Sequence, residues 1–260
     1  MTHDDLESSP RILVERAEAV AVLRLNRPDK RNAIDRGLAS ELERRLAELA
    51  EDDAVRAVVL TGNGPAFCAG ADLLDSRPAD LQSVLVGRAR RITDALDHFP
   101  KPVIAAVNGA ASGGGCELVL ASDLRIASQE ATFCLPEVRI GSLPGSGGTQ
   151  RLVRAVGSAV AAKLLMTGAP IDAAEAHRVG LVSDVYPAEV LLDAAMTLAV
   201  QVAANAPLSL LAAKQALALD GDGRGMQLER ALWALLATSR DRAEGRLAFR
   251  ERRSPRFWGE

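Results

Sequence analysis

Cysteine is scarce in this chain of 260 residues, and long hydrophobic runs are absent. The three cysteines, Cys68, Cys116 and Cys134, are odd in number and form no CxxC pair. A disulfide framework or a thiolate zinc site is therefore not indicated, and a reducing compartment fits. The most apolar stretch, 103–121, is interrupted by an asparagine, a glycine run and a glutamate, so it does not read as a membrane span.

Aromatic residues and an excess of charge are also lacking. Aromatics make up 3% of the chain, and the formal net charge is −3. A basic surface or a stacking platform for nucleic acid is therefore not indicated. The acidic start of the sequence has no apolar segment of the kind that a signal peptide needs. Arginine far outnumbers lysine and alanine is abundant, as in proteins of GC-rich genomes, so we expect a cytoplasmic bacterial protein with no membrane or nucleic-acid partner.

The chain that remains has the composition of an ordinary globular protein, 48% hydrophobic and 25% charged, and is long enough to bury a substantial core. Alternating or buried apolar segments predict strands at 11–16, 19–25, 57–60, 103–107 and 124–127. Helical periodicity predicts helices at 34–50, 81–99 and 116–121. Alternating strands and helices imply a parallel sheet with right-handed crossovers.

The pattern changes near residue 188. Segments 191–204, 208–219, 226–238 and 240–252 all predict helices, with no strand between them. We therefore predict two parts: an α/β core over 1–190 and a C-terminal helical region over 191–260.

Two glutamates beside glycine-rich turns are the strongest functional signal. Glu117 closes the run Gly113-Gly114-Gly115-Cys116, which follows a buried strand and precedes a helix, and Glu137 opens a second glycine-rich segment at 136–150. Glycine allows close approach of a ligand to the backbone, and the first N–H groups of a helix are free to donate. Such a turn can form half of an oxyanion hole, and a similar turn at 66–73 offers a second donor. Each turn alone also fits a plain strand-to-helix connection, and spacing does not show that the pieces meet.

Several segments resemble the enoyl-CoA hydratase/isomerase (crotonase) family, in order along nearly the whole chain. The motifs are Asn26-Arg27-Pro28, Gly64-Pro65-Ala66-Phe67-Cys68-Ala69-Gly70-Ala71-Asp72-Leu73, Lys101-Pro102-Val103-Ile104, Gly113-Gly114-Gly115-Cys116-Glu117-Leu118, Pro136-Glu137, Gly145-Ser146-Gly147-Gly148-Thr149-Gln150-Arg151-Leu152 and Asp241-Arg242-Ala243-Glu244-Gly245. The resemblance implies a crotonase-like α/β spiral of ββα units with a C-terminal helical trimerisation region. It also implies a homotrimer or homohexamer that binds acyl-CoA.

The same resemblance implies roles for individual residues. It makes Glu117 and Glu137 the catalytic pair and assigns the oxyanion-hole N–H groups to Ala69 and Gly114. Substrate-binding positions are Ala69, Gly70, Ala71, Asp72, Gly114 and Gly145, and Lys30 and Arg31, with Arg252 or Arg253, fall where basic residues meet the CoA phosphates. No metal and no separate cofactor are expected, because the backbone polarises the carbonyl and the substrate carries coenzyme A.

The implied reaction is the syn addition of water to a trans-2-enoyl-CoA, which gives a 3-hydroxyacyl-CoA. Glu117 serves as base toward water and Glu137 as acid toward Cα, and an acid of this kind needs a raised pKa. Isomerases of the family commonly need only the carboxylate at the position of Glu137, so the presence of both favours a hydratase, with an enoyl-CoA delta-isomerase or another acyl-CoA enzyme of the family as the alternative. The acyl chain length and the pathway stay open. Four arginines between 77 and 91 allow a polar or carboxylated acyl tail, but they fit first the solvated face of a helix.

Two readings outside this reaction are weaker. A serine hydrolase would use Ser112 in a loose nucleophile elbow, but its first glycine is missing and the three histidines, His3, His98 and His177, lie in unpromising segments. A non-catalytic, RNA-binding relative would keep the fold, but the acidic balance and few aromatics give it no platform.

Overall fold

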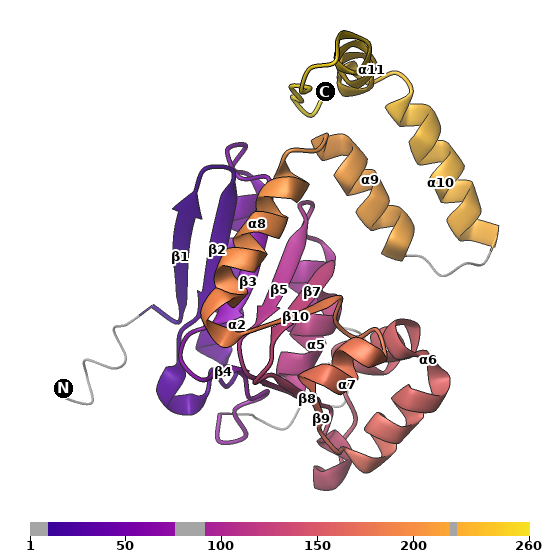
Figure 1. Cartoon of the computed structure of the whole chain (residues 1–260). Coiled ribbons are helices and arrows are strands. Elements are labelled where there is room, and N and C mark those ends of the chain that lie inside the picture. Colours follow the sequence, from indigo (N-terminus) through magenta and orange to yellow (C-terminus); the bar gives the residue numbers. More distant parts are fainter. Residues whose placement is uncertain (1–9, 76–91, 219–222) are drawn as a thin grey trace.

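The computed structural model describes residues 10–75, 92–218 and 223–260, and Figure 1 shows their arrangement. The larger sheet has the strand order β1-β2-β3-β5-β7-β10. Its strands are β1 (Ile12–Ala17), β2 (Val20–Leu25), β3 (Ala57–Gly62), β5 (Val103–Val107), β7 (Leu124–Ser128) and β10 (Asp184–Tyr186). Strands β1 and β2 correspond to the strands predicted at 11–16 and 19–25 and form an antiparallel hairpin, and every other pairing in this sheet is parallel.

A smaller sheet lies beside the first, with the order β4-β6-β8-β9. Its strands are β4 (Ala66–Cys68), β6 (Ala110–Ser112), β8 (Thr132–Cys134) and β9 (Ile171–Asp172). The chain alternates between the sheets: β3 is followed by β4, β5 by β6, and β7 by β8. A helical segment follows each pair, so the structure confirms the predicted spiral of ββα units.

The central strands of the larger sheet are buried on both faces, as expected for parallel strands under helices. Side chains on one face, such as Leu23 and Leu60, join the main core with α2 (Arg36–Ala50) and α5 (Gly114–Ala121). Leucines 38, 42, 46 and 49 of α2 recur at helical spacing, and all four are buried. Alternate side chains, such as Val22 and Val59, point to the opposite face and form a second core.

The second core is covered by α8 (Leu191–Ala203), which runs across this face of the sheet (Figure 1). Leu191, Ala195, Ala199 and Ala203 form its buried stripe, and the small side chains of the three alanines let the helix approach the strands closely. The predicted boundary at residue 190 therefore falls before a helix that packs on the α/β core. The helices that extend past the sheet in Figure 1 are α9 (Pro207–Ala218), α10 (Gly223–Leu236) and α11 (Arg240–Glu251).

The remaining elements connect these layers. They are η1 (Pro28–Lys30), α4 (Asp94–Asp97), η2 (Glu137–Ile140), α6 (Gly148–Thr167), α7 (Ala173–Arg178) and η3 (Ala188–Val190). Most of the helix predicted over 81–99 lies outside the described residues, and so do Arg77, Arg88, Arg90 and Arg91. Among the described helices, none is by itself long and apolar enough to cross a membrane. Of these same helices, only the pair formed by 188–203 and α9, bent by 108°, has the combined length and composition of a membrane span.

Candidate active site

The glycine run at 113–115 turns the chain from β6 into α5. Gly113 has φ +51° and ψ −123°, a conformation that side chains on other residues disfavour. Gly114 is the first residue of α5, and its N–H has no acceptor among the described residues. The helix therefore begins with a backbone donor that no described residue engages.

Glu117 lies in the first turn of α5 and is almost completely buried, with 3% of its surface exposed. Its Oε1 atom accepts two backbone hydrogen bonds, from Ser146 N at 2.7 Å and from Gly148 N at 2.9 Å. No described residue donates to Oε2. One carboxylate oxygen is thus fixed by the backbone, and the other is left to act on a substrate or a water molecule.

Glu137 begins η2, directly after β8 and the short connection that follows it. Its side chain is half-buried, and its Oε2 atom is fully buried without a hydrogen-bond partner among the described residues. Burial raises the pKa of this carboxyl, its own backbone N–H lowers it, and the charge of Glu117 raises it further. A buried carboxyl with a raised pKa and an unused oxygen is the kind of group that can hold and release a proton.

The structure brings the two glutamates to one turn. A Cβ placed on Gly113 would lie 3.0 Å from Glu137 Oε1, and a Cβ placed on Gly148 would lie 3.0 Å from Glu117 Oε1. Glycine at these two positions leaves room for the two carboxyl groups. The two carboxyl groups are close enough for the charge of Glu117 to contribute to the raised pKa of Glu137.

The turn after β4 approaches the same place. A Cβ on Gly70, which has φ +88°, would lie 3.4 Å from Gly114 N, and a Cβ on Gly114 would lie 4.0 Å from Ala71 N. The Ala71 N–H has no acceptor among the described residues, whereas the Ala69 N–H donates to Arg31 O at 2.9 Å. The assignment of Ala69 as an oxyanion donor therefore does not fit this structure, because its N–H is already engaged.

Asp72, expected at the substrate, makes structural contacts instead. Its carboxylate accepts from Arg27 Nη1 at 3.2 Å and Nη2 at 3.1 Å, and from Leu74 N at 3.2 Å. Its N–H donates to Ile34 O at 2.9 Å. Asp72 thus holds the turn that carries Ala71.

The structure does not join the remaining predicted positions to the two glutamates by any contact among the described residues. Lys30 and Arg31 are exposed on the loop whose backbone binds the turn of Ala69. Gly145 is exposed, and a Cβ there would meet nothing within 4 Å. Arg252 is the C-cap of α11 and Arg253 follows it; Arg253 forms ion pairs with Glu244 and Glu251.

Sequence reasoning missed the backbone groups that bind Glu117. Ser146 N and Gly148 N come from a segment 29 and 31 residues further along the chain. The spacing of glycines in 145–148 was the available signal, but a glycine run does not say which side chain its N–H groups bind.

A serine-hydrolase triad is not formed by the described residues. Ser112 Oγ accepts a contact from Cys134 Sγ at 3.2 Å, and His98 Nδ1 contacts Asp94 O on its own helix. The same part of the chain holds no group of three or more His, Cys, Asp or Glu that could bind a metal ion.

The geometry defines a class of protein: a spiral of ββα units in which two carboxyl groups lie beside free backbone donors. The family model for enoyl-CoA hydratase/isomerase matches residues 15–260. The chain belongs to this family and is an enzyme of the crotonase type.

Individual relatives agree with this membership. The chain is 43% identical to 2,3-dehydroadipyl-CoA hydratase of Escherichia coli over 95% of its own length and 98% of the relative's. It is also 43% identical to (E)-benzylidenesuccinyl-CoA hydratase of Thauera aromatica, over 95% and 99%. The crystal structure of enoyl-CoA hydratase from Bacillus anthracis superimposes with a TM-score of 0.89 at 38% identity, covering 96% of this chain and 100% of the other.

Proposed function

We propose that this chain is an enoyl-CoA hydratase, which adds water to a trans-2-enoyl-CoA and releases the 3-hydroxyacyl-CoA. The observation that carries the proposal is the pair Glu117 and Glu137 at one turn. Two N–H groups hold one oxygen of Glu117, and the pKa of Glu137 is raised by burial. A hydration needs a base toward water and an acid toward carbon, and this pair supplies both.

The carbonyl oxygen of the thioester binds between the N–H groups of Ala71 and Gly114. Both donors lack acceptors among the described residues, and the close approach of Gly70 to Gly114 N brings the two turns together. Negative charge that develops on this oxygen is stabilised by the donors and by the N-terminal end of α5. Cβ of the enoyl group thereby becomes electrophilic.

Glu117 then positions and deprotonates the water that attacks Cβ, using the oxygen that no described residue engages. Glu137 delivers its proton to Cα, and its raised pKa keeps the carboxyl protonated at a higher pH than an ordinary glutamate. Both groups act from one side of the enoyl plane, so the addition is syn. Before the next cycle, the proton that Glu117 took from water replaces the one that Glu137 gave to Cα. No metal or separate cofactor takes part.

The experiment is the hydration of crotonyl-CoA, followed by the loss of absorbance of the conjugated thioester. Turnover by the wild-type protein supports the proposal. Migration of the double bond of a 3-enoyl-CoA without hydration would favour the isomerase alternative. Binding of no acyl-CoA at all would favour a non-catalytic relative.

A carboxylated acyl tail is a narrower proposal about the substrate. The printed names of both relatives at 43% identity, dehydroadipyl-CoA and benzylidenesuccinyl-CoA hydratases, denote acyl groups with a second carboxylate. This chain has four arginines between 77 and 91, a segment outside the described residues. We expect a higher kcat/KM for 2,3-dehydroadipyl-CoA than for trans-2-hexenoyl-CoA, which has the same chain length without the carboxylate. Equal values would remove this preference.

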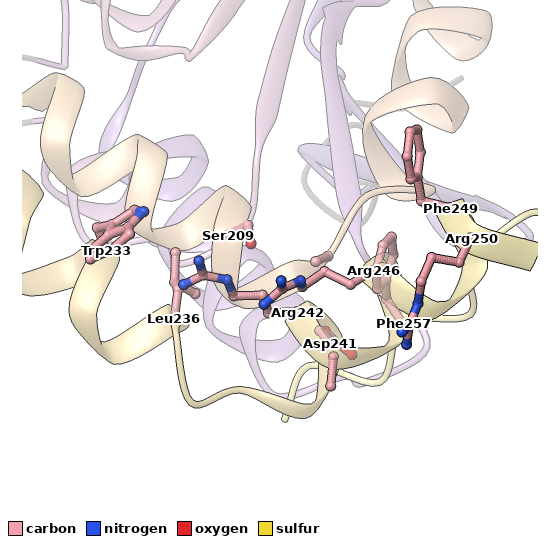
Figure 2. Close-up of a pocket in the computed structure, with 12 residues that line it drawn as sticks. Ser209, Trp233, Leu236, Asp241, Arg242, Arg246, Phe249, Arg250 and Phe257 are labelled. Carbon is pink, nitrogen blue, oxygen red and sulfur yellow. The ribbon is translucent and has the colours of Figure 1, made fainter.

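Self-association through the C-terminal helices is proposed as well. A pocket of about 890 Å³ is lined by residues of α9, α10 and α11 (Figure 2), and neither Glu117 nor Glu137 lines it. Trp233 and Phe249 at this surface are 64% and 86% exposed, and Leu235 is 69% exposed. Large apolar side chains that are exposed together are typical of a subunit interface, and a second copy of the chain in a homotrimer or homohexamer is the proposed occupant.

A further inference from the structure

The loop before α6 determines where Glu117 points. Ser146 N and Gly148 N both donate to Glu117 Oε1, so the carboxylate turns only as far as this loop allows. Three of the four residues in 145–148 are glycine. Glycine has the greatest backbone freedom of any residue, so this segment needs external contacts to keep its two donors aimed at one oxygen atom.

Those contacts converge on the carbonyl of Ser146, at the middle of the loop. Thr93 Oγ1 donates to Ser146 O at 2.9 Å, and Arg151 Nη1 donates to the same oxygen at 2.6 Å. Thr93 is fully buried. Two donors on this oxygen fix the Ser146–Gly147 peptide unit. The two N–H groups that bind Glu117 belong to the peptide units directly before and after it.

Arg151 is itself held in place. It projects from the first turn of α6 back over the loop, its N–H donates to Gly147 O at 2.9 Å, and its Nη2 forms an ion pair with Asp97. A Cβ on Gly147 would lie 2.1 Å from Arg151 Nη1, so the guanidinium lies directly against the backbone there. The side chain is only 17% exposed. Because Asp97 balances its charge, Arg151 contributes orientation more than positive potential at the site.

We propose that Arg151, together with Thr93, is a positioning residue that holds Glu117 in its working orientation through the carbonyl of Ser146. The proposal rests on the proposed hydratase function and extends it to a residue that touches neither substrate nor water. It separates the two halves of the reaction: Arg151 supports the group that acts on water, whereas the thioester clamp and Glu137 do not depend on it.

The test compares Arg151→Met, Arg151→Lys and a control, Arg178→Met, which removes an exposed ion pair with Glu175 on α7. For Arg151→Met we expect kcat of hydration to fall about 10- to 100-fold, the range that a misplacement near 1 Å causes, with KM within about twofold of wild type. Arg151→Lys keeps a donor and should recover part of the loss, and Arg178→Met should match wild type.

A second readout distinguishes positioning from general damage. Exchange of the α-protons of butyryl-CoA with deuterated water needs the thioester clamp and Glu137 but no attack by water. We expect Arg151→Met to keep this exchange within about threefold of wild type while hydration falls. Equal loss of both activities would overturn the proposal, and so would unchanged hydration in Arg151→Met.

A double-mutant cycle with Glu117→Gln gives the sharpest result. If Arg151 acts through Glu117, adding Arg151→Met to Glu117→Gln should lower kcat of hydration little further. Independent effects of the two substitutions on kcat would multiply. Should Arg151→Met fail to fold, Thr93→Val removes the other bond to Ser146 without removing a charge and enters the same cycle. Absence of hydration by the wild-type protein would instead refute the proposed function, so the two failures are distinguishable.

Discussion

Removal of a single backbone donor tests the proposed oxyanion hole. Gly114 is the first residue of α5, a position where proline is well tolerated. The residue before a proline is restricted sterically, but Gly113 has no Cβ that could clash with a proline ring at 114. The Gly114 N–H donates to no described acceptor, so Gly114→Pro deletes a donor without breaking a described hydrogen bond. The loss of one oxyanion donor costs about 3 kcal/mol in the transition state, which is about 10²- to 10³-fold in kcat.

Gly114→Ala is the matched control, because it adds bulk and keeps the N–H. A Cβ there would lie 3.1 Å from Ile34 Cδ1, the far end of a side chain that can rotate away. The assay is kcat for crotonyl-CoA hydration, with circular dichroism melting to show that both variants are folded. We expect Gly114→Ala to stay within about tenfold of wild type and Gly114→Pro to fall well below it. Similar rates for the two variants would refute a role for this N–H.

Three further changes test other parts of the structure. Folding raises the pKa of Glu137, so the ionised carboxylate destabilises the folded protein, and this loss of stability appears as pH rises through the raised pKa. Glu137→Gln should therefore have a higher Tm than wild type at neutral pH. The difference in Tm should disappear below pH 4.5, the ordinary pKa of the group. Asp72→Asn weakens the contact with Arg27 and should cost about 2 kcal/mol in urea unfolding, whereas unchanged stability with weaker acyl-CoA binding would make Asp72 a substrate ligand. Phe249→Asp should shift sedimentation toward monomer, and an unchanged oligomer would place the interface elsewhere.

Local patterns in the sequence predict most elements that have a strong period. The strand 103–107 and the helix with buried leucines 38, 42, 46 and 49 are confirmed, because burial on one face or on both imposes a readable spacing. The smaller sheet was missed, because β4, β6 and β8 have three residues each and β9 has two. Segments of this length carry no period, and only the pairing between them makes them strands.

The candidate site was also predicted only in part. Sequence singles out Glu117, Glu137 and the glycine turns, because such turns expose backbone N–H groups and stand in the order of the family's motifs. It does not distinguish Ala69 from Ala71, because both lie in one turn and only the hydrogen bond to Arg31 O shows which N–H is engaged. Nor does it reveal the loop at 146–148 that binds Glu117, because that contact joins residues far apart in the chain.

The most direct test of a two-carboxylate hydratase is the hydration rate of crotonyl-CoA by wild type, Glu117→Gln and Glu137→Gln under the same conditions. Both substitutions keep the size of the side chain and remove one proton-transferring group each. We expect both variants to lose about 10²-fold or more in kcat, since each transfers a proton in the same reaction. Wild-type rates in both would contradict the mechanism, and loss in Glu137→Gln alone would contradict a role for Glu117 and favour the one-carboxylate isomerase alternative.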